Sequence, residues 1–279
     1  MCEFCVKHGE GKKWYLQAKN YSEDLTSDLK RRRRIERVLH AFEGLSQADI
    51  ERMESVSKLP RPVRGLVASL ASVSMKKTHF GQVVPIEDVE QILTIINSVV
   101  RIPCVCRNLT VGREVRYCLA VSTTPVNDTP DEGVHRNYWW GPDTTGMDVI
   151  SREEALEFMR GIESDGVMHS VWTFGTPFIG AICNCDRSDC FAMRSTVKHG
   201  VKAMFKGEYV ASVDRDLCTG CRSCLRLCQF GAMGFSSSDK KAYIDELQCY
   251  GCGVCRAGCA KGAISLADRS TIPAVANLY

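Results

Sequence analysis

Two segments of this chain carry four cysteines each, at one repeated spacing. The segments are LCTGCRSCLRLCQFGAM (217–233) and QCYGCGVCRAGCAKGAI (248–264), and both contain the pattern Cys-x2-Cys-x2-Cys-x3-Cys. The cysteines are Cys218, Cys221, Cys224 and Cys228 in the first segment, and Cys249, Cys252, Cys255 and Cys259 in the second. Paired disulfides and zinc ribbons also use Cys-x2-Cys pairs, but they do not use two identical triplets with a fourth cysteine three residues on.

This spacing predicts two [4Fe–4S] clusters. Each iron of a cube takes one thiolate, and three cysteines two residues apart can wrap three irons within one loop. The fourth cysteine leaves the loop and, in two-cluster arrangements, reaches the other cube. The expected ligand sets are therefore crossed: Cys218, Cys221, Cys224 and Cys259 for one cluster, and Cys249, Cys252, Cys255 and Cys228 for the other. The glycines at 220, 251 and 253 suit tight loops with positive φ.

Composition places the chain among soluble globular proteins. It has 279 residues, 44% of them hydrophobic and 25% charged, and its net charge of +3 is too small to indicate nucleic-acid binding. The N-terminus MCEFCVKHGEGKKWY lacks the apolar region of a signal peptide, and the apolar stretches are too short and too polar to span a bilayer. With 16 cysteines that can act as metal ligands, we expect a reducing, cytoplasmic location without a membrane span.

Eight further cysteines precede the double motif. They are Cys2, Cys5, Cys104, Cys106, Cys118, Cys183, Cys185 and Cys190. Soft thiolates in this number can ligate further metal, and buried structural thiols are the alternative. A Cys-x-Cys pair is a poor disulfide but can supply ligands where the backbone bends. The pair Cys2 and Cys5, with His8 nearby, is either a zinc or cluster half-site or a terminus without ligands.

Two resemblances to known families add to this interpretation. Residues 209–266 resemble the bacterial dicluster ferredoxins, except that Gln229 and Ala260 stand where that family has proline. The stretches PCVCR, YCL, SREEALEFMRGIESDGVMHSVW and ICNCD…C, upstream of such a motif, resemble a group of cytoplasmic anaerobe proteins described as 4Fe–4S dicluster-binding. That resemblance implies a further iron–sulfur centre held by four of the six cysteines between 104 and 190. Relatives often have further cysteines where this chain reads CDRSDC.

The predicted fold class is α+β, with a mostly helical N-terminal domain and a small sheet followed by a dicluster ferredoxin-like domain. Expected regions are 1–100 (helical, with the Cys-x2-Cys terminus), 101–208 (cysteine-rich and continuous with the first), 209–267 (ferredoxin-like) and 268–279 (tail). Helical periodicity and capping signals predict helices at 22–44, 46–59, 61–77, 85–99 and 151–163, and a helix from Cys190 through 205. Alternating apolar residues predict strands at 115–121, 168–174 and 241–244.

The predicted function is single-electron transfer, as a subunit or dedicated partner of an anaerobic oxidoreductase. The sequence contains neither a dinucleotide-binding Gly-x-Gly-x-x-Gly nor a phosphate-binding loop, so the clusters are the visible redox groups. One alternative is an enzyme whose upstream centre binds substrate, with His169 as proton donor; a core histidine is the other interpretation of His169. Another is a redox sensor that uses the basic run 30–34, although neighbouring acidic residues and the spread around a helix favour a solvated surface.

Overall fold

The computed structural model describes residues 13–33, 37, 46–56, 58–112, 115–125 and 148–279. The candidate ligands Cys2 and Cys5 lie outside the described residues. The helices are α3 (Gln47–Val56), α4 (Arg61–Thr78), α5 (Ile86–Ile95), α6 (Val105–Val111), α8 (Arg152–Glu163), α9 (Phe191–His199) and α10 (Ser223–Leu227). Short 3-10 helices are η1 (Trp14–Leu16), η2 (Ala18–Tyr21), η3 (Glu23–Thr26), η4 (Val254–Gly258) and η5 (Arg269–Thr271).

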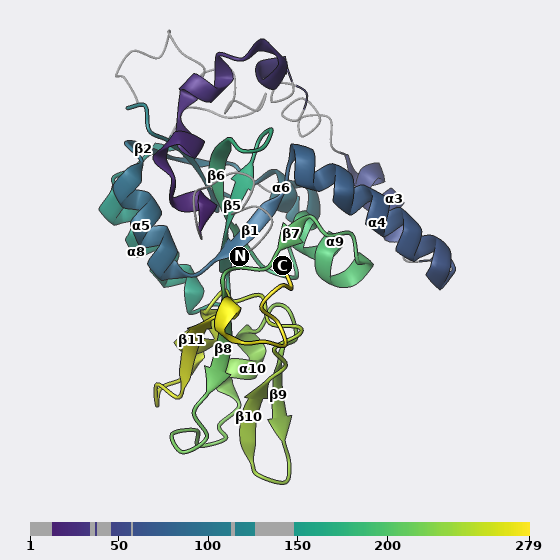
Figure 1. Cartoon of the computed structure of the whole chain (residues 1–279), viewed down its shortest axis with the longest axis vertical. Helices are drawn as coiled ribbons and strands as arrows, with labels where there is room; N and C mark the ends of the chain where they lie inside the picture. The colour runs from purple at the N-terminus through teal and green to yellow at the C-terminus, as the bar shows by residue number, and fades with distance from the viewer. Residues whose placement is uncertain (1–12, 34–36, 38–45, 57, 113–114, 126–147) are drawn as a thin grey trace.

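A seven-stranded sheet organises the upstream part of the chain (Figure 1). Its strands are β1 (Gly81–Val84), β2 (Ser98–Ile102), β3 (Cys118–Ser122), β4 (Asp148–Val149), β5 (Met168–Thr173), β6 (Ile179–Cys185) and β7 (Met204–Phe205), in the order β4-β2-β3-β6-β5-β1-β7. All neighbouring strands are antiparallel except β1 and β7, which are parallel. Strands from 81–102 pair with strands from 118–205, so the regions 1–100 and 101–208 contribute to one sheet.

Apolar layers cover both faces of this sheet. Alternate strand residues face opposite sides, so Val171 and Ile182 pack with α5 and α8 in one core, whereas Trp172 and Ala181 pack with α9 in the other. Helix α8 begins as expected at Ser151, whose side chain and that of Glu154 form a capping box. The second core continues into the C-terminal part of the chain, which lies below the sheet in Figure 1.

The C-terminal part contains two small antiparallel sheets. Strand β8 (Tyr209–Val213) pairs with β11 (Ile264–Asp268), and β9 (Met233–Ser236) pairs with β10 (Lys241–Ile244). The last residues pack back onto this unit, because the buried Arg269 donates hydrogen bonds to the carbonyls of Gly207, Tyr209 and Cys249. The residues after 267 are therefore part of the packed structure. The domain limits at 209 and 267 stay predictions.

A buried carboxylate joins the two parts of the chain. Asp88, on α5, is fully buried and accepts hydrogen bonds from Lys13 at 2.8 Å, from the Tyr15 hydroxyl at 2.6 Å and from the Tyr209 hydroxyl at 2.9 Å. Tyr209 opens β8, so this carboxylate connects the N-terminal segment, the sheet unit and the cysteine-rich unit. With one cation and two hydroxyl groups around it, its charge is compensated in the core.

The structure corrects several expectations. The sheet is not small, since it has seven strands. Strands β1 and β2 were not predicted because they are buried almost throughout and their sequences do not alternate. The helix expected at 85–99 ends at Ile95, since Ser98–Ile102 forms β2 with its β-branched residues. The helix expected to run through 205 ends at His199, because Gly200 takes the left-handed conformation that terminates helices.

The N-terminal helix is also shorter than expected over the part that is described. Residues 23–26 form η3 and residues 29–33 are helical, with the Asp28 carboxylate accepting from the backbone N–H groups of Lys30 and Arg31. The remainder of the expected helix, except Arg37, lies outside the described residues. None of the helices in the described part of the chain combines the length and apolar character needed to cross a lipid bilayer.

Candidate metal centres

The two cysteine segments adopt matching local structures. In the first, Asp214 Oδ1 accepts from the backbone N–H groups of Asp216 and Leu217, and in the second, Asp245 Oδ1 accepts in the same way from Leu247 and Gln248. Each of these turns leads directly into a three-cysteine loop. The final cysteine of each motif also has an equivalent contact: Ala232 N–H donates to Cys228 Sγ and Ala263 N–H to Cys259 Sγ, both at 3.2 Å.

Glycine is required at the equivalent position of both loops. Gly220 and Gly251 have φ values of 73° and 76°, and a Cβ atom there would lie 2.1 Å from the carbonyl oxygens of Lys240 and Tyr209, respectively. The expectation of positive φ holds at Gly253 as well. At the position equivalent to Gly253, the first loop has Arg222 with φ 66°, and its guanidinium stacks 3.9 Å from the Phe235 ring centre. The loops are thus closed by backbone contacts that larger residues would break.

The first crossed set of thiols lines one cavity. Cys218, Cys221, Cys224 and Cys259 surround a volume of about 240 Å³, together with apolar side chains such as Val213 and Ile264. This is roughly eight times the volume that one water molecule occupies in the liquid. The cavity has room for a multi-atom group, and its four sulfurs come from both segments.

The second crossed set is also brought together. Cys249, Cys255 and Cys228 are electrostatic neighbours of Cys252. Burial raises the pKa of Cys255 to about 12 and raises the pKa of Cys252 well above its usual value. A buried thiolate is stabilised when a cation compensates its charge, which is what a metal centre supplies. Cys221 of the first set is exposed, whereas its counterpart Cys252 is half-buried.

The six upstream thiols form a cluster separate from the two C-terminal ligand sets. In order of side-chain contact, they are Cys183, Cys118, Cys104, Cys106, Cys190 and Cys185. The closing pair, Cys190 and Cys185, has its sulfurs 3.2 Å apart. Hydrogen bonding with Cys106 raises the pKa of Cys104 to about 12. All six candidate cysteines between 104 and 190 are therefore gathered at one place, and the fourteen cysteines among the described residues are free thiols.

Strand geometry explains how these six thiols meet. Cys183 and Cys185 are two residues apart on β6, so both side chains lie on one face of the sheet, and Cys118 on β3 lies beside Cys183. In this pair the two thiols lie on one face of an extended strand, without a bend in the backbone. The backbone does bend at Cys104 and Cys106, where the chain leaves β2 and turns at Cys104 into α6.

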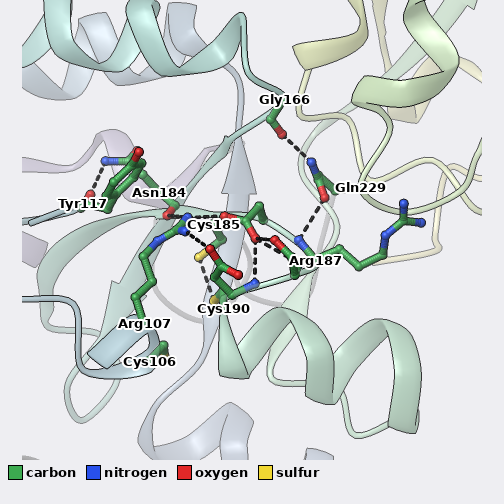
Figure 2. Close-up of polar contacts among 12 residues, drawn as sticks. Cys106, Arg107, Tyr117, Gly166, Asn184, Cys185, Arg187, Cys190 and Gln229 are labelled. Carbon is green, nitrogen blue, oxygen red and sulfur yellow. Dashed lines mark hydrogen bonds and ion pairs between the residues drawn. The ribbon is translucent and has the colours of Figure 1, made fainter. Parts of the chain in front are cut away.

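A buried arginine holds the loop between Cys185 and Cys190. Arg107, which follows Cys106, donates to Asp189 at 3.0 Å and pairs with Asp186, and its guanidinium lies 4.2 Å from the Tyr117 ring centre (Figure 2). Asp186 also accepts from the backbone N–H of Ser188 and Asp189. The two aspartates of CDRSDC thus bind Arg107. The motif PCVCR contains this arginine, but its role could not be predicted from the motif alone.

Gln229 accounts for one departure from the ferredoxin pattern. Its Nε2 donates to the Gly166 carbonyl at 2.7 Å, and its Oε1 accepts from the Arg187 backbone N–H at 2.9 Å (Figure 2). Gly166 precedes β5 and Arg187 follows Cys185, so Gln229 connects Cys228 with the upstream thiols. A proline at this position could make neither bond.

Gln229→Ala should loosen this contact without removing a ligand. Two hydrogen bonds between the units would be lost, which we expect to lower local stability by about 1–3 kcal/mol. Hydrogen exchange measured by mass spectrometry should become faster at residues 186–189. Gln248→Ala is the matched control, because Gln248 is exposed and its side chain donates to Asp245 within its own turn. Equal exchange in both variants would contradict the assigned role.

His169 lies on the opposite face of the sheet from the thiols. It pairs in register with Asn184, between the positions of Cys183 and Cys185, and its Nδ1 is 2.7 Å from Asn184 Oδ1. Its Nε2 is 3.8 Å from Glu163 Oε1, and burial lowers the pKa of His169 to about 4. The interpretation of His169 as a ligand or proton donor at the upstream thiols is therefore wrong, and the core interpretation fits.

Glu163→Gln should stabilise the protein at alkaline pH. Burial raises the pKa of the Glu163 carboxyl to about 7, whereas its ordinary value is about 4.5. Between these two pH values the folded state keeps the proton and the unfolded state releases it. Wild-type stability should fall as pH rises from about 4.5 to about 7, by roughly 2–3 kcal/mol. Thermal unfolding should show the variant and wild type alike at pH 5 and the variant more stable at pH 8. Glu157→Gln, at an exposed position of α8, should show no such pH-dependent gain, and a gain for Glu163→Gln that is the same at both pH values would contradict the prediction.

The sulfur sites fit iron–sulfur groups by donor type, loop conformation and cavity. Within the described residues, no three Cys, His, Asp or Glu side chains are already grouped as they would be around a single metal ion. The inference of cluster binding therefore depends on the four-thiol sets, the glycine-dependent loops and the cavity. Each cluster would be held by a crossed set of thiols in the C-terminal unit.

Comparison with known proteins identifies one region. Residues 217–264 match the family model of the 4Fe-4S dicluster domain. The chain thus contains an iron–sulfur domain of the ferredoxin type, and the match spans both cysteine segments. Among curated proteins, none matches this chain.

Proposed function

We propose that this protein is a single-electron carrier with two [4Fe–4S] clusters between residues 217 and 264 and a further iron–sulfur cluster on four of the six upstream thiols. It would serve an anaerobic, cytoplasmic oxidoreductase as a subunit or dedicated partner. When bound, the clusters would supply reversible one-electron chemistry. The matched dicluster domain supports the first two centres, and the gathered thiols support the third.

One continuous apolar core carries the proposal. It contains Cys185 and Cys190 of the upstream group and Leu227, Phe230 and Val254 of the dicluster unit, with Cys106, Cys183, Tyr250 and Cys252 packed against it. Four of the six upstream thiols and Cys252 of the second ligand set therefore share one apolar environment. An apolar shell of this kind limits the access of water to metal centres and tunes their redox potential, as an electron carrier requires.

Aromatic packing joins the two cysteine segments, and Lys206 attaches them to the sheet unit. Phe230 follows the first motif, Tyr250 lies inside the second, and their rings stack with centres 3.9 Å apart and planes inclined by 4°. Lys206, from the segment after β7, lies 5.2 Å from the Tyr250 ring centre and donates to the Leu247 carbonyl. The Lys206 contacts hold the second ligand loop against the segment that follows the sheet.

The exposure of the three sulfur sites gives them an order. Cys221, in the first set, is exposed, whereas Cys252 of the second set packs against the core that contains Cys185 and Cys190. We expect partners to exchange electrons at the loop around Cys221, with the upstream group as the innermost site. Arg256 follows Cys255 and donates to the Glu87 carboxylate of α5 at 2.8 Å, which attaches the second ligand loop to the sheet unit.

The substrate-binding alternative receives less support. It requires an iron without a thiolate and a proton donor beside it, but six thiols crowd the upstream site and His169 lies across the sheet. The sensor alternative depended on the basic run 30–34, of which residues 30–33 are described. The backbone at Lys30 and Arg31 is capped by Asp28, and nothing there marks a nucleic-acid surface.

A reductive titration tests the proposed function. Anaerobically purified protein should take up about three electrons per chain from a low-potential dye and return them on reoxidation, as expected for three one-electron centres. Electron paramagnetic resonance (EPR) of the reduced protein should show interacting clusters. Uptake of no electrons, or only irreversible uptake with loss of the spectra, would contradict a carrier function.

A further inference from the structure

Helix α4 presents its apolar side to the outside of the molecule. The outward residues, which we call the α4 face, are Val63, Leu66, Val67, Leu70 and Val73, with Leu66 63% and Leu70 65% exposed. Their spacing of three and four residues places them in one stripe along the helix. Such a stripe normally faces the core, so this helix is reversed relative to an ordinary surface helix.

The inward side of α4 carries mainly small and polar residues, together with the half-buried Met75. Ala68 is buried and Ser72 half-buried, and Ser72 Oγ accepts from the Lys202 backbone N–H at 3.0 Å. Near the end of the helix, the Lys76 carbonyl accepts from Thr176 Oγ1 at 3.2 Å. The helix is therefore attached to the sheet unit through its polar side, and its leucines and valines remain outside. Figure 1 shows α4 at the edge of the molecule beside α3.

The charged residues on α4 and next to it in the sequence all have one sign. No acidic residue occurs between Glu54 and Glu87, while Lys58 and Arg61 stand at the start of the helix and Lys77 at its end, all three exposed. Acidic side chains on a partner would complement both ends of the stripe. A second copy of this chain would instead bring like charges together, whether the two helices paired parallel or antiparallel.

We infer that the α4 face docks a different protein, one that presents an apolar helix flanked by acidic side chains. Leucine and valine stripes of this length pack against a helix of the same character by interlocking side chains. The basic residues at both ends fix the register and steer the encounter. The site lies on the sheet unit, away from the exposed Cys221 loop, and its partner need not be the one that exchanges electrons there.

Site-specific photo-crosslinking tests this inference. Ser74 is exposed and lies within the stripe, so p-benzoylphenylalanine at this position can react with whatever covers the α4 face. The variant is expressed at native level in the source cells, irradiated anaerobically, and the crosslinked peptide is mapped by mass spectrometry. We expect a peptide of one other protein, from an apolar helix with Asp or Glu within a turn of each end.

Two sets of variants sharpen the result. Leu66→Gln with Leu70→Gln, and separately Lys58→Glu with Arg61→Glu and Lys77→Glu, should each lower the crosslink yield by about tenfold. Leu29→Gln is the matched control, because Leu29 is 64% exposed and lies on the N-terminal segment. Iron content should be unchanged in every variant, so failure of this inference is separable from failure of the proposed function.

Four outcomes would overturn the inference. They are a crosslink to a second copy of this chain, a crosslinked peptide without flanking acidic residues, no crosslinked protein, and a yield unaffected by either set of variants. Flotation of the purified protein with phosphatidylcholine–phosphatidylglycerol vesicles, lost in the Leu66→Gln, Leu70→Gln variant, would assign the face to a lipid surface and would also overturn it.

Discussion

Cys259→Ser should free the thiols of the loop 218–224 and leave those of its own loop protected. If the ligand sets are crossed, Cys259 completes the cluster of Cys218, Cys221 and Cys224, with which it lines one cavity. The variant should lose about four irons per chain. Anaerobic alkylation followed by mass spectrometry should then modify those three cysteines, while Cys249, Cys252 and Cys255 remain unmodified.

The reciprocal variant makes this a strict test of pairing. Cys228→Ser should expose Cys249, Cys252 and Cys255 to alkylation and leave the first loop protected. Ala260→Ser is the control, because it adds a serine at an exposed position next to Cys259 without removing a ligand. Alkylation of Cys249, Cys252 and Cys255 in Cys259→Ser would show that each loop supplies its own fourth ligand, contrary to the crossed arrangement.

Replacing Cys104, Cys118 and Cys183 together with serine should abolish the upstream centre. These three thiols are consecutive in the chain of contacts, and only three of the six would remain, too few for four thiolates. Iron should fall from about twelve to about eight per chain. The EPR signals of the dicluster unit should persist with weaker interactions, and the electrons taken up should fall by about one.

A buried serine hydroxyl can destabilise an apolar core by itself, so the control variant must also bury a hydroxyl group. Ala120→Ser does so on the same face of β3, two residues from Cys118, and Ala120 is only 3% exposed. This control should keep about twelve irons. If the triple variant keeps as much iron as Ala120→Ser, the upstream thiols are structural and the third centre does not exist.

The cysteine segments could be interpreted from sequence because their chemistry is local. Ligand spacing within a loop does not depend on the rest of the fold, and positive φ at Gly220, Gly251 and Gly253 follows from the same local requirement. The capping box at Ser151 and the strand at 241–244 were predictable for the same reason. Such signals depend on a few neighbouring residues, so no tertiary information is needed.

The remaining features depend on contacts between distant residues. Strands β1 and β2 are buried almost throughout, so their sequences lack the alternation that identifies a strand. The six upstream thiols come from β3, β6, α6 and the start of α9, and only the strand register shows that they meet. The roles of Arg107 and Gln229 likewise become visible only when Asp186, Asp189 and Gly166 are in place.

Iron and acid-labile sulfide content of the wild-type protein, purified under strict anaerobiosis and examined by EPR after reduction, tests the central claim most directly. The chain should contain about twelve irons and about twelve sulfides, with spectra of [4Fe–4S] clusters. Fewer than about eight irons in fully reconstituted protein would exclude two complete clusters between residues 217 and 264 and contradict the proposed electron transfer.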